Sequence, residues 1–308
     1  MKWIAKALVQ KTISFLPARE RLNLFFQRHV TKGVALTDEH FAYKVEHARD
    51  HIAFFKKYGQ PGAEKLIVEL GTGWYPVIPI LFHLTDTGKV ISFDLQNWLR
   101  KEGYLSVIRK LKEWRENEKL QSFFPHLNEE KWEALQQVST ESDQFSLEDL
   151  NRHIGLQTVV GDAARSGLPA QGVDFICSNN TFEHIFPAAL RSILMEYKRI
   201  AKPGAVMSHF VDLSDHFAHF DPSLTIYNFL RFSKKSWSII DNRIQPQNRL
   251  RWKDYLALYQ DLDLPITEES IRKGDLTALA SVPVHEEFAA YTPEELAISH
   301  GYLVSQIG

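Results

Sequence analysis

The sequence predicts an α/β fold in which a doubly wound, largely parallel sheet carries helices on both faces. Three observations predict it: a series of short apolar runs, helical stretches between them, and a glycine-containing turn directly after the first run. Continuous apolar strands are typical of parallel sheets that helices cover on both sides. The chain has 308 residues, 44% of them hydrophobic, which is enough for one large core with an appendage.

The expected elements change in character near residue 60. Before it the pattern is helical, with Pro17 ending a first helix and a second helix taking its apolar face from Leu22, Phe25, Phe26 and Val30. We expect a helical cap over residues 1–60 and a larger domain over residues 61–308. The predicted strands of that domain are Leu66–Leu70, Val90–Leu95, Thr158–Val160, Val173–Ser178 and Ala205–Phe210.

About sixty residues, roughly 98–155, separate the second and third predicted strands, which is far more than a normal crossover needs. Trp98–Lys119 and Glu129–Val138 have helical spacing, and Ser146–Asp149 resembles the capped start of a further helix. We therefore predict a helical insertion. It is either a lid over the carboxyl ends of the strands or a decoration without contact to substrate.

Composition excludes several classes of protein. The net charge of -2, from 36 basic and 38 acidic side chains, argues against a duplex nucleic-acid binder and favours a small-molecule partner. A single cysteine, Cys177, forms no internal disulfide, and its apolar neighbours predict a buried thiol in a cytoplasmic protein. No apolar run has the length of a membrane span.

The N-terminal segment Met1–Pro17 interleaves lysines with apolar residues. We expect a helix packed on its own domain, and weak contact with a membrane surface is the alternative. Homodimer formation is compatible with the aromatic-rich faces that the sequence predicts.

The strongest motif is the turn Glu69–Pro76, which follows the first predicted strand. Gly71 and Gly73 allow a tight turn and close approach of a ligand to the backbone. A dinucleotide site favours glycine or alanine where Pro76 stands, because a helix amide must face the pyrophosphate. S-adenosylmethionine has no phosphate and carries an ammonium group, for which Glu69 is a suitable partner.

Two further carboxylates end predicted strands. Asp94 follows the second strand, where it can accept hydrogen bonds from both ribose hydroxyls. Asp162 and Ala163 follow the third strand, where a carboxylate and two backbone amides can contact an adenine ring. The alternative for Asp162 is that it caps the following turn.

A fourth segment, Val173–Ile185, contains Asn179 and a Glu-His pair, and it is followed by a Lys-Pro-Gly turn at residues 202–204. Together with the three earlier motifs, and in the same order, these residues resemble the class I S-adenosylmethionine-dependent methyltransferases. The resemblance covers roughly residues 60–215. One departure is Tyr75, which stands where the family often has a third glycine.

The resemblance implies a Rossmann-like sheet of seven strands with the last strand antiparallel. Pro265–Ile271 and Tyr302–Ile307 are candidates for the last two strands, and Arg251–Asp261 for the preceding helix. The resemblance also implies that the cofactor is S-adenosylmethionine. The predicted cofactor-binding residues are Glu69, Gly71, Thr72, Gly73, Asp94, Asp162, Ala163 and Asn179.

Methyl transfer is an in-line displacement on an activated carbon, so positioning the acceptor supplies most of the catalysis. An oxygen acceptor also has to lose a proton, and histidine is suited to remove it near neutral pH. The candidates are His184, His209 and His216. Asp212 and Asp215 beside the last two offer a metal-chelating alternative, and a solvated loop is a third interpretation; we predict no metal.

A basic and aromatic region follows, which could hold an anionic or glycosidic acceptor or form an ordinary surface. Its residues are Arg231, Lys234, Lys235, Arg243, Arg249 and Arg251, interleaved with Tyr227, Phe232, Trp237 and Trp252.

The sequence therefore predicts an enzyme that transfers a methyl group from S-adenosylmethionine to a small acceptor, most readily at oxygen. A nicotinamide-dependent oxidoreductase and a non-catalytic S-adenosylmethionine-binding protein remain as alternatives.

Overall fold

The computed structural model describes residues 3–13, 15, 36–242 and 246–308. The chain divides into two compact units. Unit 1 contains the N-terminal helix together with Asn180–Arg191 and Phe210–Leu303, and unit 2 contains Leu36–Asn179, Ser192–His209 and Val304–Gly308. The predicted cap and domain boundary near residue 60 stays a prediction.

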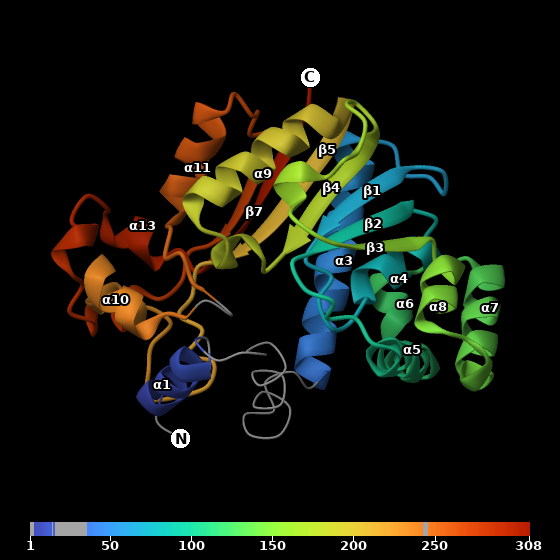
Figure 1. The fold of residues 1–308 in the computed structure, drawn as a ribbon, viewed down its shortest axis with the longest axis horizontal. Coiled ribbons are helices and arrows are strands. Elements are labelled where there is room, and N and C mark those ends of the chain that lie inside the picture. Colours follow the sequence, from blue (N-terminus) through green and yellow to red (C-terminus); the bar gives the residue numbers. More distant parts are fainter. Residues whose placement is uncertain (1–2, 14, 16–35, 243–245) are drawn as a thin grey trace. The chain divides into compact units, whose positions relative to one another are not determined.

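The described residues form a seven-stranded sheet with the order β3-β2-β1-β4-β5-β7-β6 (Figure 1). This order confirms the predicted Rossmann-like fold, and each predicted strand is present. The strands are β1 (Leu66–Leu70), β2 (Lys89–Asp94), β3 (Leu156–Val160), β4 (Val173–Asn179), β5 (Ala201–Asp212), β6 (Glu268–Arg272) and β7 (His300–Gln306).

Strands β1, β2, β3 and β4 pair in parallel. At the beginning of β5, the amide of Gly204 donates to Ile307 O, and the amide of Ile307 donates to Ala205 O. The start of β5 thus lies beside the end of the chain, so β7 runs antiparallel to β5, as predicted. β5 begins four residues earlier than expected and includes the Lys-Pro-Gly segment.

In unit 2, two helices cover one side of the sheet through Phe175 of β4. Helix α3 (Asp38–Tyr58), capped by the Thr37 side chain, places Phe55 in a stack on Phe175 with ring centroids 4.6 Å apart. Phe82 of α4 (Val77–Leu84) meets the same ring edge-on at 6.1 Å. Cys177 of β4 is buried, as its apolar neighbours predicted.

The insertion between β2 and β3 is helical, as predicted. Its helices are α5 (Lys101–Glu116), α6 (Lys119–Phe123), α7 (Glu129–Thr140) and α8 (Leu147–His153), the last beginning with a capping box at Ser146. The hydroxyl of Tyr104 in α5 donates to Leu150 O in α8, and both residues are buried. Lys131 in α7 forms an ion pair at 2.7 Å with Asp86, directly after α4. The insertion is therefore anchored to unit 2 as a folded layer.

In unit 1, helix α1 (Trp3–Ile13) packs on a core of aromatic and aliphatic residues through Trp3 and Ala7. The Trp3 ring lies 5.5 Å from that of Phe217. Ile4 and Leu8 remain more than half exposed on the other side of α1. Contact of this side with a membrane surface and formation of a homodimer stay predictions.

The second predicted helix of the cap, with Leu22, Phe25, Phe26 and Val30, lies outside the described residues. None of the helices that the structure describes is long and apolar enough to span a bilayer.

Unit 1 also contains β6 and the first part of β7. It contains α10 (Lys234–Ile240), α11 (Trp252–Asp261), α12 (Leu276–Ala280) and α13 (Pro293–Ala297), and α9 (Pro187–Ile200) begins in this unit.

Arg251, directly before α11, is fully buried and donates to the carbonyl oxygens of Leu213, Leu296 and Ile298. It therefore joins the end of β5 to α13 and to the segment before β7. Since buried carbonyls need partners, this guanidinium is a structural clamp.

Replacing Arg251 by methionine should lower the free energy of unfolding by about 3–5 kcal/mol, because three buried carbonyls lose their donor. Urea unfolding followed by circular dichroism measures this change.

The control is Lys253→Met. Lys253 forms an exposed ion pair with Glu295 at 3.0 Å, so its replacement should cost less than about 1 kcal/mol. Equal effects of the two substitutions would contradict the clamp.

Candidate functional site

The carboxyl ends of β1, β2 and β4 lie level with one another in unit 2. Leu70 of β1 pairs with Phe93 of β2 and with Ser178 of β4. Adjacent strands are about 4.8 Å apart, so the residues that follow, Gly71, Asp94 and Asn179, form a row. The register thus brings together residues from three of the predicted cofactor motifs.

The turn after β1 has the backbone conformation that its glycines predict. Gly71 and Gly73 have φ angles of 85° and 69°, in the region that disfavours side chains. A Cβ at Gly73 would meet no atom within 4 Å, so the space beside it is open to a ligand. The Gly73 amide donates to Asp94 Oδ2 at 3.2 Å, which connects the turn to β2.

Glu69 is the buried acid of the site, with 3% of its surface exposed. The hydroxyl of Thr72 donates to its carboxylate and lies 2.6 Å from the hydroxyl of Ser92. Burial raises the pKa of Glu69 to about 7, against the opposing effects of Thr72 and Lys44. A cation beside this carboxyl would favour its ionised form.

Burial also raises the pKa of Asp94, to about 6, while the Gly73 amide and Lys44 act in the opposite direction. Lys44 lies on α3 and interacts electrostatically with both Glu69 and Asp94. Burial lowers the pKa of Lys44, and the two carboxyls partly compensate. Lys44 could not be predicted as a site residue, because nothing in the helical pattern of α3 marks it as a neighbour of β1.

After β3, the Gly161 amide donates to Asp94 O at 3.0 Å, which places the third predicted motif beside the second. Ala163 is buried, whereas Asp162 is exposed and accepts a hydrogen bond from the Ala164 amide at 2.9 Å. Asp162 therefore caps the turn, which was the alternative to adenine binding. Because only one of the two carboxylate oxygens accepts this capping hydrogen bond, adenine binding by Asp162 stays a prediction.

The insertion and α3 support the glycine turn from outside. Gly103 at the start of α5 lies so close to the carbonyl of Trp74 that a Cβ there would clash with it. Tyr75, the departure from the family pattern, meets His40 of α3 edge-on at 6.2 Å. The insertion therefore reaches the turn, and its role as a lid stays a prediction.

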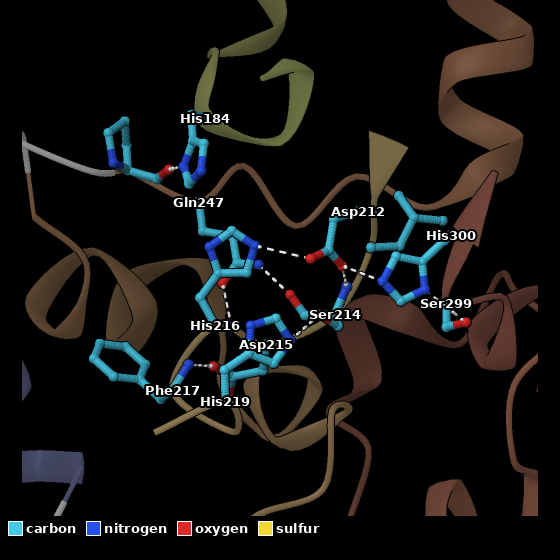
Figure 2. A network of polar contacts seen from close by, with 12 residues as sticks. His184, Asp212, Ser214, Asp215, His216, Phe217, His219, Gln247, Ser299 and His300 are labelled. Carbon is cyan, nitrogen blue, oxygen red and sulfur yellow. Dashed lines mark hydrogen bonds and ion pairs between the residues drawn. The ribbon is translucent and has the colours of Figure 1, made fainter. Parts of the chain in front are cut away.

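In unit 1, two of the three predicted histidines lie together (Figure 2). The rings of His184 and His216 are 4.9 Å apart at an angle of 67°. Asp212, at the end of β5, lies with Oδ2 3.4 Å from His216 Nε2 and with Oδ1 3.3 Å from His300 Nε2. Burial would raise the pKa of Asp212, but contacts with His216, His300 and Ser214 hold it well below its ordinary value.

His209 belongs to unit 2 and has a different environment. It is fully buried, its Nδ1 lies 2.8 Å from the Ser178 hydroxyl, and its ring stacks on Tyr197 at 5.9 Å. Burial lowers the pKa of His209 to about 3. These contacts favour a packing role, and base catalysis by His209 stays a prediction.

The alternative of a metal held by Asp212 and Asp215 gains no support from the hydrogen bonds. Asp215 is fully buried, and its two oxygens accept from the Phe217 amide and from the side chain of Asn228. Both oxygens are thus occupied by protein donors.

The basic and aromatic region is largely structural. Arg251 is the buried clamp, and Arg249 donates to the carbonyls of Phe229 and Phe232. Trp237 belongs to the core of unit 1. These contacts favour a structural role for the three residues, and binding of an acceptor by this region stays a prediction. Arg243 lies outside the described residues.

A small cavity of about 40 Å³ lies beside His216, lined also by Lys6, Gln10 and Gln247. It has room for little more than a water molecule or an ion, since ligand pockets typically measure about 300–1,000 Å³. A second cavity, of about 330 Å³, lies at the amino ends of β1, β4 and β5 in unit 2. Its lysines, Lys65 and Lys202, are paired with Asp174. Ligands of open α/β sheets bind at the carboxyl ends, so we do not assign it to the reaction.

Residues 131–208 match the family model described as a methyltransferase domain. No curated protein is similar enough in sequence to match.

Solved structures with a similar fold include geranyl diphosphate C-methyltransferase from Streptomyces coelicolor A3(2). It is 13% identical with a TM-score of 0.47, over 87% of this chain and 79% of that one. A putative sarcosine dimethylglycine methyltransferase from Galdieria sulphuraria is 12% identical, with a TM-score of 0.46 over 86% and 85%. These likenesses are too distant to assign an acceptor. The family model covers about a quarter of this chain, and its match agrees with the family that the motifs predicted, whose fold the strand order shows.

The raised pKa of Glu69 makes stability depend on pH. The folded state holds a proton on Glu69 up to about pH 7, whereas the unfolded state loses it near the ordinary value of 4.5. The folded chain therefore binds more protons in this window, and stability falls as the pH rises through it. In the protein without cofactor, the free energy of unfolding should decrease between pH 4.5 and pH 8 by about 2–3 kcal/mol less for Glu69→Gln than for the original chain. Urea unfolding at the two pH values measures this difference.

The control is Glu64→Gln, because Glu64 is exposed and its ion pair with Lys89 holds its pKa below the ordinary value. This variant should retain the fall in stability. A pH dependence of Glu69→Gln identical to that of the original protein would refute the assignment of a neutral buried carboxyl.

Proposed function

We propose that this chain is an S-adenosylmethionine-dependent methyltransferase, which its fold and the family match over residues 131–208 support, and that it methylates an oxygen of a small molecule. The observation that carries the donor assignment is the buried acid Glu69 beside an open, glycine-lined turn. The proposed acceptor chemistry rests on the histidine pair in unit 1.

Each charged part of the donor has a suitable partner at the row of strand ends. Glu69 would bind the ammonium group, which compensates for the cost of ionising a buried carboxyl. Asp94 would accept from the ribose hydroxyls, and Lys44 would pair with the donor's carboxylate. The remaining predicted residues, Gly71, Thr72, Gly73, Asp162, Ala163 and Asn179, would shape the turn and the adenine end.

A nicotinamide dinucleotide fits these residues less well. Pro76 is the residue directly before α4, and it has no amide for a pyrophosphate. A buried acid at Glu69 would moreover repel the phosphates. Calorimetric titration with S-adenosylmethionine, its demethylated product and NAD separates the two classes, and tight binding of NAD alone would exclude the donor proposed here.

Asp94→Asn and Lys44→Gln should each raise the Kd for S-adenosylmethionine about tenfold or more, because each removes a charge-assisted contact worth about 1.5–3 kcal/mol. Isothermal titration calorimetry measures this change.

The matched control is Lys89→Gln, which removes an exposed lysine of β2 that pairs with Glu64. It should leave the Kd unchanged. Unaltered donor affinity in both test variants would show that the strand ends do not hold the donor.

Of the three candidate bases, we assign the proton-accepting role to His216. It is partly exposed, lines the small cavity and has Asp212 behind its Nε2. A carboxylate in this position orients an imidazole. Burial and the neighbouring His216 lower the pKa of His184 to about 4, which makes it a weaker base.

His216→Gln should lower kcat for methyl transfer by about 10²–10⁴-fold, the usual contribution of a general base, with little change in the Kd for the donor. The assay follows the labelled methyl group from the donor into an acceptor found in metabolite extracts.

His126→Gln, at an exposed position of unit 2, is the control and should retain full activity. Activity of His216→Gln within twofold of the original would remove His216 from the mechanism. Absence of any labelled product across broad extracts would instead favour the non-catalytic binding protein.

A further inference from the structure

The carboxyl of Glu183, in the turn Phe182–His184 of unit 1, is buried without a hydrogen bond. Its residue is 2% exposed, and neither Oε has a hydrogen-bond partner among the described residues. Burial and the nearby Asp212 carboxyl raise the pKa of Glu183 well above its ordinary value, and the electrostatic effect of the backbone amides of Glu183 and Asp212 opposes this only in part. A buried polar group without a partner is costly, so this side chain is suited to binding a ligand.

Two imidazoles face the same point. His184 Nδ1 lies 2.8 Å from the carbonyl oxygen of Pro246, which accepts only, so Nδ1 carries the proton and Nε2 has a free lone pair (Figure 2). His216 is oriented by Asp212 at 3.4 Å. One ligand atom from each of Glu183, His184 and His216 lies within 4.8 Å of the other two.

We infer that Glu183, His184 and His216 form a binding site for a divalent transition-metal ion, with Zn²⁺ as the best fit. Two neutral nitrogens and one carboxylate match the ligand preference of Zn²⁺, whereas Mg²⁺ and Ca²⁺ prefer oxygen. Zn²⁺ bonds of about 2.0–2.2 Å place tetrahedral ligands about 3.4 Å apart. The present separations reach up to 4.8 Å, so the side chains would have to rotate toward one another to bind the ion.

The surroundings satisfy the other needs of such a site. Polar partners behind ligating histidines fix their orientation. His184 donates to the Pro246 carbonyl, and the Asp212 carboxylate lies 3.4 Å from His216 Nε2. Glu183 and Asp212 are two neighbouring buried carboxylates, and among the described residues no lysine or arginine forms an ion pair with either. The positive charge of the ion would compensate for their negative charge. The cavity beside His216 has room for a water molecule, although Glu183 and His184 do not line it.

This inference does not rest on the proposed function. Metal binding and base catalysis would use the same lone pair of His216, so the effect of the ion on methyl transfer is a separate question. An ion-bound oxygen loses its proton more readily, so a bound ion could take over the role assigned to His216.

The test is calorimetric titration of the chelator-treated full chain with ZnCl₂ and, separately, MgCl₂. We expect one zinc site per chain and no comparable magnesium site. Glu183→Gln, His184→Ala and His216→Ala should each weaken zinc binding at least tenfold, and His126→Ala, an exposed histidine elsewhere, should not.

Two further measurements keep the test valid if a variant is unstable. Circular dichroism checks that each variant is folded, and Zn²⁺ should raise the Tm of the original chain and of His126→Ala but not of the three site variants. Co²⁺ in place of Zn²⁺ should give the visible absorption of a four-coordinate site, which the site variants should lack.

Failure to bind Zn²⁺, or equal binding by the original chain and the three site variants, would overturn the inference. Titration of the same metal-free protein with S-adenosylmethionine tests the donor site separately. Its outcome distinguishes failure of the metal site from failure of the proposed methyl transfer.

Discussion

The level carboxyl ends of β1, β2 and β4 are the constraint from which the donor site follows. Because Leu70 pairs with both Phe93 and Ser178, the next residue of each strand is placed in one row. The glycine turn then begins at the edge of the sheet, and its Gly73 amide is held by the Asp94 carboxylate. A slip of one residue in either pairing would separate these groups, so core packing and site geometry are fixed by the same hydrogen bonds.

The electrostatics of this row explain why a donor with a positive charge suits it. Glu69 is buried and Asp94 is half-buried, and burial raises both pKa values toward neutrality. Lys44 compensates for them only in part. Ionising these carboxyls therefore carries a desolvation cost, which an ammonium group would relieve and a phosphate would aggravate. The charge of the ligand, more than the glycine turn, is therefore what favours a methyl donor over a dinucleotide at this site.

Strand ends and turn residues could be predicted from the sequence because their causes are local. Apolar runs determine β1 to β5, and Gly71, Gly73 and Asp94 stand directly at their ends. Lys44 and the clamp of Arg251 could not be predicted, because their partners are distant in the chain and their helices carry no special pattern. His184 and His216 were each proposed singly, and only tertiary structure brings them together with Glu183. Sequence likewise could not show that His209 is buried against Tyr197.

A buried, largely protonated Glu69 should ionise when it meets the ammonium group of the donor. Proton release on binding of S-adenosylmethionine near pH 6.5, measured by titration calorimetry in buffers of different ionisation enthalpy, tests this directly. We expect release of a substantial fraction of a proton from the original chain and clearly less from Glu69→Gln. Binding without proton release, or equal release by both proteins, would contradict it.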